Sequence, residues 1–373
     1  MKIGFDAKRA FKNRTGLGNY SRSLIEALHQ YFPQHQYQLF TPLLEGKPSL
    51  FDEAFDMKSV RVVQARTKFL SSFWRTFRVP SLLHKKGVQL YHGLSAELPA
   101  GTKPKGVPYV VTIHDLIFLR FPELYPAMDR KIYGYKTRAA CEKADMIIAI
   151  SEQTKQDLIS YLQVPAEKIT VVYQTCNPVF ERSVSEVCKK EISQKYHLPE
   201  RFILCVGTLE ARKNALLLLK SLLHLPKEVN VVLVGKPTEY QKKIEAYIKE
   251  HHLENRVWML PQVSFDDLPV LYQLASIFVY PSIFEGFGIP VIEALKSGVP
   301  VIAATGSCLE EAGGPDSLYV RPDDDFALAQ HIAALWDDED FRQAQIEKGL
   351  TFAQKFSLKD FAAHTMQVYQ TLV

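Results

Sequence analysis

The stretch VYPSIFEGFGIPVIE, residues 279–293, decides the fold expected for this chain. It opens within an apolar strand, residues 277–280, which Pro281 ends. A glycine-bearing turn follows at residues 285–288, and Pro290 opens a helix, since the missing proline N–H would have no partner in a first helical turn. Such a step from strand to helix directs backbone N–H groups and the positive end of the helix dipole toward an anion.

Two carboxylates frame this turn. Glu285 lies before the helix and Glu293 lies one or two turns into it, so the two side chains should reach different parts of one ligand. Carboxylates bind phosphate poorly but accept hydrogen bonds from hydroxyls well. The combination predicts a site for a ligand with a diphosphate in the middle and hydroxyls at both ends, which describes a nucleotide sugar.

Length and composition indicate an ordinary globular protein. The chain has 373 residues and 47% hydrophobic residues, which favours two domains. No apolar run approaches the roughly 18 residues of a membrane span, and the N-terminus reads as a first strand rather than a signal segment, so export is not expected. Five dispersed cysteines without C-x-x-C spacing indicate neither zinc nor a disulfide framework, and a reducing cytoplasm is the expected setting.

The net charge of +4 hides an asymmetry between the two halves of the chain. Residues 1–182 hold 26 Lys and Arg against 16 Asp and Glu, whereas residues 183–373 hold 19 against 25. A basic first half favours an anionic partner on that side, such as a phospholipid surface or a lipid diphosphate acceptor, although a basic solvated surface explains the charge equally well. We find no nucleic-acid-binding motif.

Strand-like runs alternate with helical patterns along the chain, which predicts an α/β fold with two doubly wound, mostly parallel sheets. The polar segment 175–199 is the expected linker between the domains, and a ligand cleft is expected at the carboxyl ends of the strands. The predicted strands are 2–5, 37–40, 60–63, 90–92, 109–113, 146–150 and 169–172 in the first domain, and 202–206, 231–234, 257–259, 277–280 and 301–303 in the second.

A glycine pattern follows the first strand. Gly16 and Gly18 precede a helix that should run to about residue 29. In a dinucleotide-binding fold the first glycine follows the strand almost at once, whereas here about ten residues intervene, so the spacing argues against that interpretation. A glycine-containing start of a helix is the simplest explanation from the residues alone.

Residues 68–78, KFLSSFWRTFR, place aromatic and basic side chains at helical spacing and predict an amphipathic helix. Two interpretations are open for this helix. It either lies on an anionic membrane or packs against the sheet of the first domain.

His114 and Asp115 follow a buried strand, at the end where sites form in this architecture. A neutral imidazole both donates and accepts hydrogen bonds and so is able to orient sugar hydroxyls. Ser151 begins the next helix and is expected to be its N-cap.

In the second half, the segment GTLEARKN, residues 207–214, follows a strand. It places Arg212 and Lys213 at the start of a helix, where cations are unfavourable unless an anion is bound there. Asp323, Asp324 and Asp325 resemble a metal-binding D-x-D pattern, but capping and the helix dipole explain acidic residues at a helix start.

These motifs together resemble the retaining glycosyltransferases of the GT-B fold, family 4 in particular. The resemblance spans nearly the whole chain and rests on Gly16-x-Gly18, G-T-x-x-x-R-K-N and E-G-F-G-x-P-x-x-E. It implies that Arg212 and Lys213 hold the donor diphosphate, with Thr208 where some relatives carry Arg. It also implies that Glu285 contacts the donor sugar and Glu293 the ribose.

The remaining roles follow from the same resemblance. His114 would approach the donor sugar, the Gly16 and Gly18 segment would face the donor phosphates, and Gly286, Phe287 and Gly288 would offer backbone N–H groups. The implied domains are an acceptor-side domain at 1–182, a nucleotide-sugar domain at 183–355 and a terminal helix at 356–373 that crosses back to the first domain. No metal or other cofactor is implied.

The implied activity is transfer of a hexose, with retention, from a nucleotide sugar to an acceptor hydroxyl. The residues of these motifs resemble those of mannosyltransferases of bacterial surface-polysaccharide synthesis. GDP-mannose is therefore the first donor to test, and a glycan or lipid-linked glycan is the expected acceptor. UDP- and dTDP-sugars remain open. Two other classes also remain open: a dehydrogenase or epimerase on a related architecture, and a non-catalytic nucleotide-sugar sensor.

Overall fold

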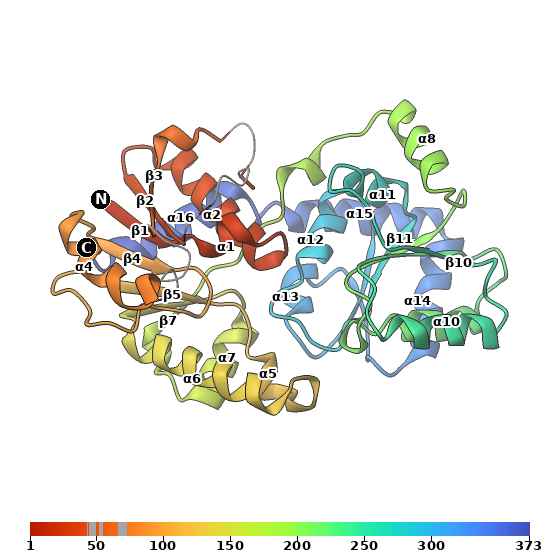
Figure 1. The fold of residues 1–373 in the computed structure, drawn as a ribbon. Coiled ribbons are helices and arrows are strands. Elements are labelled where there is room, and N and C mark those ends of the chain that lie inside the picture. The colour runs from red at the N-terminus through yellow and green to blue at the C-terminus, as the bar shows by residue number, and fades with distance from the viewer. Residues whose placement is uncertain (43, 45–49, 52–54, 66–72) are drawn as a thin grey trace. The chain divides into compact units, whose positions relative to one another are not determined.

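The computed structural model describes residues 1–42, 44, 50–51, 55–65 and 73–373, and its chain divides into two compact units. The first unit comprises Met1–Gln174 together with Ser357–Val373, and the second comprises Thr175–Phe356 (Figure 1). The second unit therefore begins at Thr175 rather than at residue 183. The chain leaves the first unit and returns to it for its last helix.

The first unit is built on a seven-stranded parallel sheet in the order β3-β2-β1-β4-β5-β6-β7. Strands buried on both faces read as continuous apolar runs, which is why these segments are recognisable in the sequence. The strand order reverses direction at β1, so right-handed crossovers place helices on both faces. The strands are β1 Lys2–Asp6, β2 Gln36–Thr41, β3 Arg61–Gln64, β4 Leu90–Gly93, β5 Tyr109–Ile113, β6 Met146–Ala149 and β7 Ile169–Val171.

Helices of very different length connect these strands. The last helix of the chain, α16, packs against α2 in this unit. The helices are α1 Lys8–Lys12, α2 Gly16–Tyr31, α4 Val79–Lys85, α5 Ile117–Arg120, α6 Ala127–Lys143, α7 Glu152–Leu162 and α16 Leu358–Gln370, with short turns η1 Met57–Ser59, η2 Trp74–Arg78, η3 Pro122–Leu124 and η4 Ala166–Lys168.

The second unit repeats the design with a six-stranded parallel sheet in the order β10-β9-β8-β11-β12-β13. Its strands are β8 Ile203–Val206, β9 Val231–Val234, β10 Val257–Leu260, β11 Ile277–Tyr280, β12 Val301–Ala304 and β13 Leu318–Val320. Its helices are α8 Glu186–Lys195, α9 Ala215–Ser221, α10 Gln241–Glu250, α11 Leu268–Leu274, α12 Ile289–Lys296, α13 Leu309–Gly313, α14 Asp325–Asp337 and α15 Glu339–Ala353, with short turns η5 Pro178–Glu181, η6 Ala211–Lys213 and η7 Leu222–His224.

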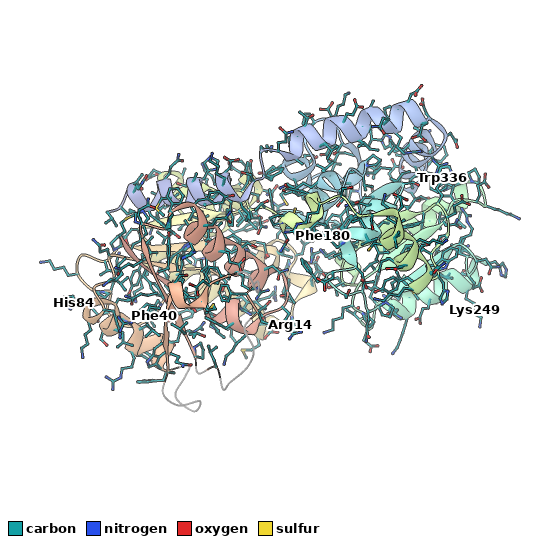
Figure 2. All side chains as sticks on the ribbon, turned by 90° about the horizontal axis from the view of Figure 1, so that it is seen from above. Arg14, Phe40, His84, Phe180, Lys249 and Trp336 are labelled. Carbon is teal, nitrogen blue, oxygen red and sulfur yellow. The ribbon has the colours of Figure 1, made fainter. Side chains whose placement is uncertain are left out.

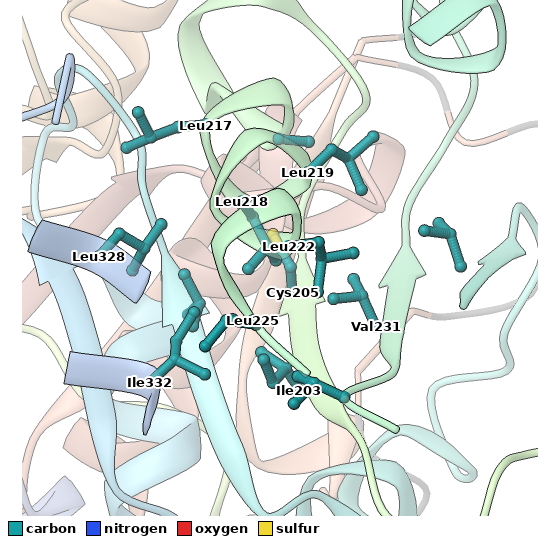
Figure 3. Close-up of a cluster of buried hydrophobic side chains, with 14 of the residues drawn as sticks. Ile203, Cys205, Leu217, Leu218, Leu219, Leu222, Leu225, Val231, Leu328 and Ile332 are labelled. Carbon is teal, nitrogen blue, oxygen red and sulfur yellow. The ribbon is translucent and has the colours of Figure 1, made fainter. Parts of the chain in front are cut away.

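Each unit has its own buried core (Figure 2). In the second unit, leucines of α9 and η7 meet β8, β9 and α14 in one apolar cluster, in which Leu218, Leu222 and Ile332 are fully buried (Figure 3). In the first unit, Phe40 is buried while His84 lies at the surface. Burial of this kind contributes about 25 cal/mol for each Å² of apolar surface removed from water.

Two predictions about the chain need correction, and one is confirmed. The polar segment 175–199 is not a linker, because Phe180 is buried within the second unit and α8 begins at its N-cap Ser185. The edge strand β13 was missed, because it has only three residues and two of them are half-buried. Helix α2 begins at Gly16, within the segment that was expected to precede it, so Gly16 and Gly18 form the glycine-containing helix start that the residues alone favoured.

The predicted amphipathic helix at residues 68–78 lies partly outside the described residues, since 66–72 are not described. In its described part, Phe73 and Phe77 are about half exposed and their ring centroids lie 5.0 Å apart. Arg75 instead turns inward and pairs with Asp6 and Glu97. Among the helices that the structure describes, none is long and apolar enough to cross a membrane.

Candidate active site

The predicted donor residues of the second unit meet where its strand order reverses. Strand β8 lies between β9 and β11, so the loops after β8 and β11 leave the sheet in opposite directions and open a crevice at their carboxyl ends. Arg212 and Lys213 come from the loop after β8, and Glu285 comes from the loop after β11. The sheet topology therefore brings together residues that lie 72 positions apart in the chain.

The loop after β8 turns Arg212 and Lys213 toward β11. Both residues lie in the 3-10 turn η6, and Asn214 then adopts a left-handed conformation with φ of 57° before α9 begins. The side-chain amide of Asn214 donates to the carbonyls of Pro281 and Pro322, at 3.2 and 2.8 Å. These bonds fix the loop to the neighbouring strand ends, so the two cations are held in place before any ligand binds.

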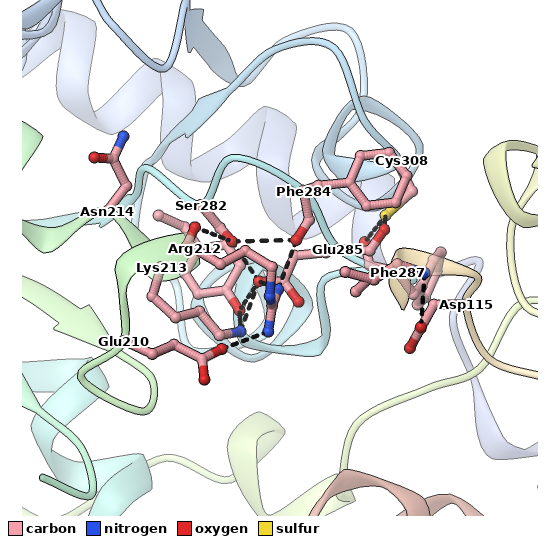
Figure 4. A network of polar contacts seen from close by, with 12 residues as sticks. Asp115, Glu210, Arg212, Lys213, Asn214, Ser282, Phe284, Glu285, Phe287 and Cys308 are labelled. Carbon is pink, nitrogen blue, oxygen red and sulfur yellow. Dashed lines mark hydrogen bonds and ion pairs between the residues drawn. The ribbon is translucent and has the colours of Figure 1, made fainter. Parts of the chain in front are cut away.

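The carboxylate of Glu285 is the centre of a dense polar network (Figure 4). Its Oε1 atom lies 2.6 Å from the Lys213 amine and 2.8 Å from the Arg212 guanidinium. It also accepts hydrogen bonds from the hydroxyls of Ser282 and Tyr280, the latter at 3.2 Å. All four contacts end on Oε1, and among the residues that the structure describes none contacts Oε2 in this network.

Charge keeps the Glu285 carboxyl ionised although it is buried. Burial raises the pKa of this group, but the charges of Lys213 and Arg212 outweigh burial and hold the pKa below its ordinary value. For Arg212, burial lowers the pKa, and Glu285 and Glu210 raise it further than burial lowers it. The unliganded site is therefore a set of ionised groups that neutralise one another.

Glu293 lies in a different environment. It is carried by α12, and its Oε2 accepts a hydrogen bond of 2.9 Å from the buried Tyr272 hydroxyl. Burial raises the pKa of Glu293 to about 7, because no cation compensates the loss of water as it does at Glu285. Near neutral pH Glu285 is thus ionised, whereas Glu293 is a mixture of its protonated and ionised forms.

The turn between the two glutamates can contact a ligand through its backbone rather than through its side chains. The Phe287 side chain is buried and its ring packs edge-on against Phe356 at 5.6 Å, so Phe287 can contact a ligand only through its backbone. Gly288, with φ of 116°, caps the start of α12, and a Cβ there would meet Leu309 at 2.8 Å. The Cys308 thiol donates to the carbonyls of Glu285 and Phe287 and so fixes the turn from behind.

The contacts of Thr208 and of the glycines of α2 say little about how a ligand would bind. Thr208 lies two residues after the end of β8, and its carbonyl accepts the N–H of Glu210. Gly16 is open to its surroundings, whereas a Cβ at Gly18 would lie only 1.8 Å from the Asn13 carbonyl oxygen. Close packing within the first unit thus requires a glycine at position 18 but not at position 16.

His114 follows β5 in the first unit, and its side chain is half-buried. Its Nε2 lies 2.9 Å from the Leu94 carbonyl, which only accepts, so Nε2 carries the proton and Nδ1 is left as an acceptor. Burial lowers the pKa of this imidazole to about 4, so the ring is neutral at physiological pH. The Tyr20 ring packs edge-on against it with a centroid distance of 4.6 Å.

A buried polar chain runs beneath His114 within the first unit. Tyr369 of α16 and His92 of β4 are hydrogen-bonded at 2.6 Å, and His92 and Thr112 of β5 at 2.8 Å. Thr112 and Tyr20 of α2 are hydrogen-bonded at 2.9 Å. Every member is almost completely buried, so the chain ties the last helix of the protein to the strand that carries His114.

The buried hydrogen-bonded chain through His92 predicts a contribution to stability that is lost in acid. Burial holds the pKa of His92 at about 3, whereas a histidine in an unfolded chain titrates near 6.5. Between these two pKa values the unfolded state binds a proton at His92 that the native state does not bind. The contribution of neutral His92 to the free energy of unfolding is therefore complete above pH 6.5 and is lost progressively as the pH falls toward 3. Between pH 6.5 and 5 the loss through His92 is about 2 kcal/mol.

Urea unfolding of the wild type and of His92→Gln at both pH values measures this contribution. We expect the variant to lose less stability on acidification than the wild type. The exposed His84 provides a matched control, and His84→Gln should behave as the wild type does. An equal loss in His92→Gln and wild type would contradict the assignment.

Several members of the polar network were not predicted. Tyr272 and Cys308 contact the predicted residues through the tertiary fold, whereas Glu210, Tyr280 and Ser282 lie within five residues of the side chains that they contact. The position of Tyr280 as the last residue of β11 was the one available signal. Ser151 and Asp324 are N-caps as predicted, bonding the N–H groups of Thr154 and Ala327. In the described part of the chain, no three His, Cys, Asp or Glu side chains are grouped to hold a metal.

Solved structures share this architecture over the whole chain. Sucrose-phosphate synthase from Thermosynechococcus elongatus superimposes with a TM-score of 0.79 at 21% identity, covering 100% of this chain and 99% of that one. WaaG, a glycosyltransferase of lipopolysaccharide biosynthesis, superimposes with a TM-score of 0.70 at 15% identity and 99% coverage of both chains. The two parallel units have the GT-B fold that these structures share.

Two family models together cover most of the sequence. The model for Glycosyltransferase Family 4 matches residues 14–178, and the model for Glycosyl transferases group 1 matches residues 189–351. The chain belongs to this glycosyltransferase family, the group 1 enzymes of family 4.

Curated relatives cover either the whole chain or parts of it. O-antigen chain mannosyltransferase B of Escherichia coli is 28% identical over the full length of both chains. O-antigen chain mannosyltransferase RfbU of Salmonella typhimurium is 29% identical over 58% of this chain and 57% of that relative.

Proposed function

We propose that this glycosyltransferase moves a mannosyl residue from GDP-mannose to a hydroxyl of a glycan or lipid-linked glycan in surface-polysaccharide synthesis, with retention of configuration. The observation that carries the proposal is the Glu285 carboxylate, anchored through one oxygen by two cations at the strand-order reversal of the second sheet. The full-length relative named as a mannosyltransferase supports mannose as the sugar.

Arg212 and Lys213 bind the donor diphosphate in this proposal. Their charges neutralise the negative charge that builds on the leaving nucleoside diphosphate, the task that a divalent cation performs in other enzymes. The reaction accordingly proceeds without a metal or other cofactor, and turnover should persist in the presence of EDTA. Thr208 and the backbone N–H groups of residues 286–288 add contacts to the phosphates or the sugar.

Glu285 holds the hydroxyls of the donor sugar through its unused oxygen, and Glu293 holds the ribose. We assign this residue to donor orientation rather than to covalent attack, with Oε1 anchored by Lys213 and Ser282. In the proposed same-face displacement, the bond from the anomeric carbon to the diphosphate breaks, the acceptor oxygen bonds to that carbon, and the diphosphate oxygen takes the acceptor proton. His114, with its neutral ring, and the segment of Gly16 and Gly18 contribute to turnover from the first unit.

The direct test is an incubation with GDP-mannose and a mannose-terminated acceptor glycan, with UDP-glucose and dTDP-glucose in parallel. We expect GDP release with GDP-mannose and a product whose anomeric proton shows the α configuration of the donor by NMR. Release of a nucleoside diphosphate from another donor instead would support the same enzyme class with a different donor sugar. An inverted product would overturn retention, and binding of every donor without any release would favour a sensor.

Glu293 predicts a pH dependence of donor binding. Its pKa of about 7 means that the ionised carboxylate, which can accept from both ribose hydroxyls, forms as the pH rises through 7. Between pH 6 and 8 the affinity for GDP-mannose should rise by up to about tenfold. Calorimetric titrations across this range test the prediction, and Glu293→Gln should flatten the profile. An unchanged profile in Glu293→Gln would contradict the ribose assignment.

The charge of the first unit supports peripheral membrane contact at the inner face of the cytoplasmic membrane. This unit carries the excess of Lys and Arg, and the half-exposed Phe73 and Phe77 add apolar surface. We expect sedimentation with anionic vesicles at low salt and not with zwitterionic ones. No sedimentation with either would remove this part of the proposal.

A further inference from the structure

The strand that leads into the donor turn, β11, presents a different kind of side chain on each of its faces. Side chains alternate along a strand. Ile277 and Val279 point to one face and join the apolar cluster that holds the leucines of α9. Phe278 and Tyr280 point to the other face, where their rings stack with centroids 5.9 Å apart. The face of β11 that turns away from α9 is therefore aromatic.

A third ring, from α11, extends this aromatic face. Tyr272 packs against Phe278 with a centroid distance of 5.2 Å. We call Tyr272, Phe278 and Tyr280 the aromatic row, and all three side chains are almost completely buried. Burial raises the pKa of both tyrosine hydroxyls well above its ordinary value, so both keep their protons and remain hydrogen-bond donors.

Each hydroxyl of the aromatic row contacts one glutamate of the motif. The Tyr272 hydroxyl donates to Oε2 of Glu293 at 2.9 Å. The Tyr280 hydroxyl donates to Oε1 of Glu285 at 3.2 Å. Because an amine only donates, the Lys213 amine, 2.6 Å from the same hydroxyl, occupies a lone pair of the oxygen and leaves its proton for the carboxylate. The row thus fixes one oxygen of each glutamate from within the core of the unit.

The hydroxyl of Tyr272 also influences the charge of its partner Glu293. Three elements bring charged or titratable side chains near this carboxyl: Tyr272 on α11, Cys176 before η5, and Lys296 one turn further along α12. Burial raises the pKa of the Cys176 thiol, which therefore stays neutral. The Lys296 amine pairs with Glu181 at 2.6 Å. Among these groups, it is the Tyr272 hydroxyl whose hydrogen bond lowers the pKa of Glu293 against the effect of burial.

We propose that the aromatic row positions both glutamates of the donor site. Tyr272 turns the second oxygen of Glu293 toward the ribose, and Tyr280 turns the second oxygen of Glu285 toward the donor sugar. The proposal rests on the function proposed above, to which it adds two positioning residues. Tyr272 also lowers the pH at which Glu293 becomes able to accept from the ribose hydroxyls. Tyr280 acts on orientation alone, since the two cations of the site already keep its partner ionised.

Replacing Tyr272 by phenylalanine should weaken GDP binding in a manner that depends on pH. The ring keeps its packing on Phe278, so the unit should fold, but the ionised form of Glu293 loses a hydrogen bond and forms only at higher pH. We expect the affinity for GDP to fall about fivefold at pH 7 and to recover to within about twofold of the wild type at pH 8.5. The affinity for inorganic pyrophosphate, which has no ribose, should stay unchanged at both pH values.

Calorimetric titration measures both ligands. Tyr247→Phe, at a partly buried tyrosine of α10, is the matched control and should bind them as the wild type does. An equal loss of GDP affinity at both pH values, or a loss of pyrophosphate affinity in Tyr272→Phe, would indicate general damage to the site and overturn the role of Tyr272.

NMR of glutamate carboxyls labelled with ¹³C tests the same contact without any ligand. The resonance that is missing from Glu293→Gln identifies Glu293, and its titration midpoint should lie at higher pH in Tyr272→Phe than in the wild type or in Tyr247→Phe. An unchanged midpoint would overturn the role of Tyr272 whether or not the protein binds GDP. A raised midpoint in a protein that binds no nucleotide would support the contact with Glu293 and count against the proposed function.

Replacing Tyr280 by phenylalanine should separate turnover from binding. The charges of Arg212 and Lys213 that hold the diphosphate are retained, whereas the Glu285 carboxylate loses the hydroxyl that directs it. We expect kcat for transfer from GDP-mannose to fall about tenfold, with the Kd for GDP changed by less than about twofold. An unchanged kcat would overturn the role of Tyr280, and so would a Kd for GDP that rises as much as kcat falls.

Discussion

Replacing Glu285 by glutamine is expected to slow sugar transfer about 100-fold while tightening the binding of free GDP. Glutamine keeps the shape of the side chain but removes the charge that holds one oxygen for the donor sugar, and loss of a single positioned polar contact typically costs 100-fold or more in turnover. The opposite effect on GDP follows from the unliganded network. The carboxylate neutralises Arg212 and Lys213, at 2.8 and 2.6 Å, and so competes with the diphosphate for both cations.

Removal of this internal anion should raise the affinity for GDP by about tenfold, equivalent to 1.4 kcal/mol. It should also lower the stability of the unliganded protein by about 1–3 kcal/mol, because the half-buried cations of Arg212 and Lys213 lose the carboxylate that they share, and saturating GDP should restore that loss. Calorimetric titration and thermal unfolding measure both effects. Glu250→Gln, at an exposed position of α10, is the matched control. Unchanged turnover, or weaker GDP binding in Glu285→Gln, would contradict the role assigned to Glu285.

Replacing Lys213 by methionine is expected to weaken GDP binding about 100-fold. The amine of Lys213 lies 2.6 Å from both Glu285 and the Tyr280 hydroxyl, and its removal deletes one of the two charges available to the diphosphate. Truncating one partner of a buried charge pair costs 2–5 kcal/mol or more in comparable complexes, about 30-fold to several thousand-fold in affinity. Methionine keeps the length of the side chain, and Arg212 still neutralises Glu285, so the unit should fold.

Lys213 gives a cleaner test than Arg212. The Arg212 guanidinium also donates to the Phe284 carbonyl at 2.6 Å and pairs with Glu210, so its removal would disturb the loop after β11. Lys220→Met, at an exposed position of α9, controls for the loss of a positive charge in the same unit. GDP affinity that falls equally in both lysine variants would indicate a general charge effect rather than a diphosphate contact.

The strands of this fold were predictable because burial leaves a direct trace in the sequence. Segments such as Tyr109–Ile113 and Val231–Val234 are continuous apolar runs, as strands covered on both faces must be, and the structure places them at the predicted residues. The edge strand Leu318–Val320 carries no such trace, since only Val320 is buried. The segment 175–199 misled for the converse reason, because α8 packs through few apolar residues and is otherwise polar.

The candidate site was predictable at the level of which loops meet. Arg212, Lys213 and Glu285 each follow the end of a parallel strand, and such ends share one edge of a sheet. The hydroxyls of Ser282 and Tyr280 that complete the network were not predicted, since their contacts with Glu285 depend on how the loop after β11 folds back on itself. His92 likewise reads as an ordinary strand residue, and only the packing of α16 supplies its partner Tyr369.

The central claim is that the cluster of Arg212, Lys213 and Glu285 is a donor site, and a thermal-shift panel tests it most directly. The melting temperature of the wild type and of Lys213→Met is measured with GDP, UDP, ADP and dTDP and their sugars, in EDTA. A ligand at 100 times its dissociation constant stabilises the native state by about 2.7 kcal/mol. We expect a clear upward shift of the melting temperature with GDP and GDP-mannose in the wild type and a much smaller one in Lys213→Met. No shift with any nucleotide, or equal shifts in both proteins, would contradict it.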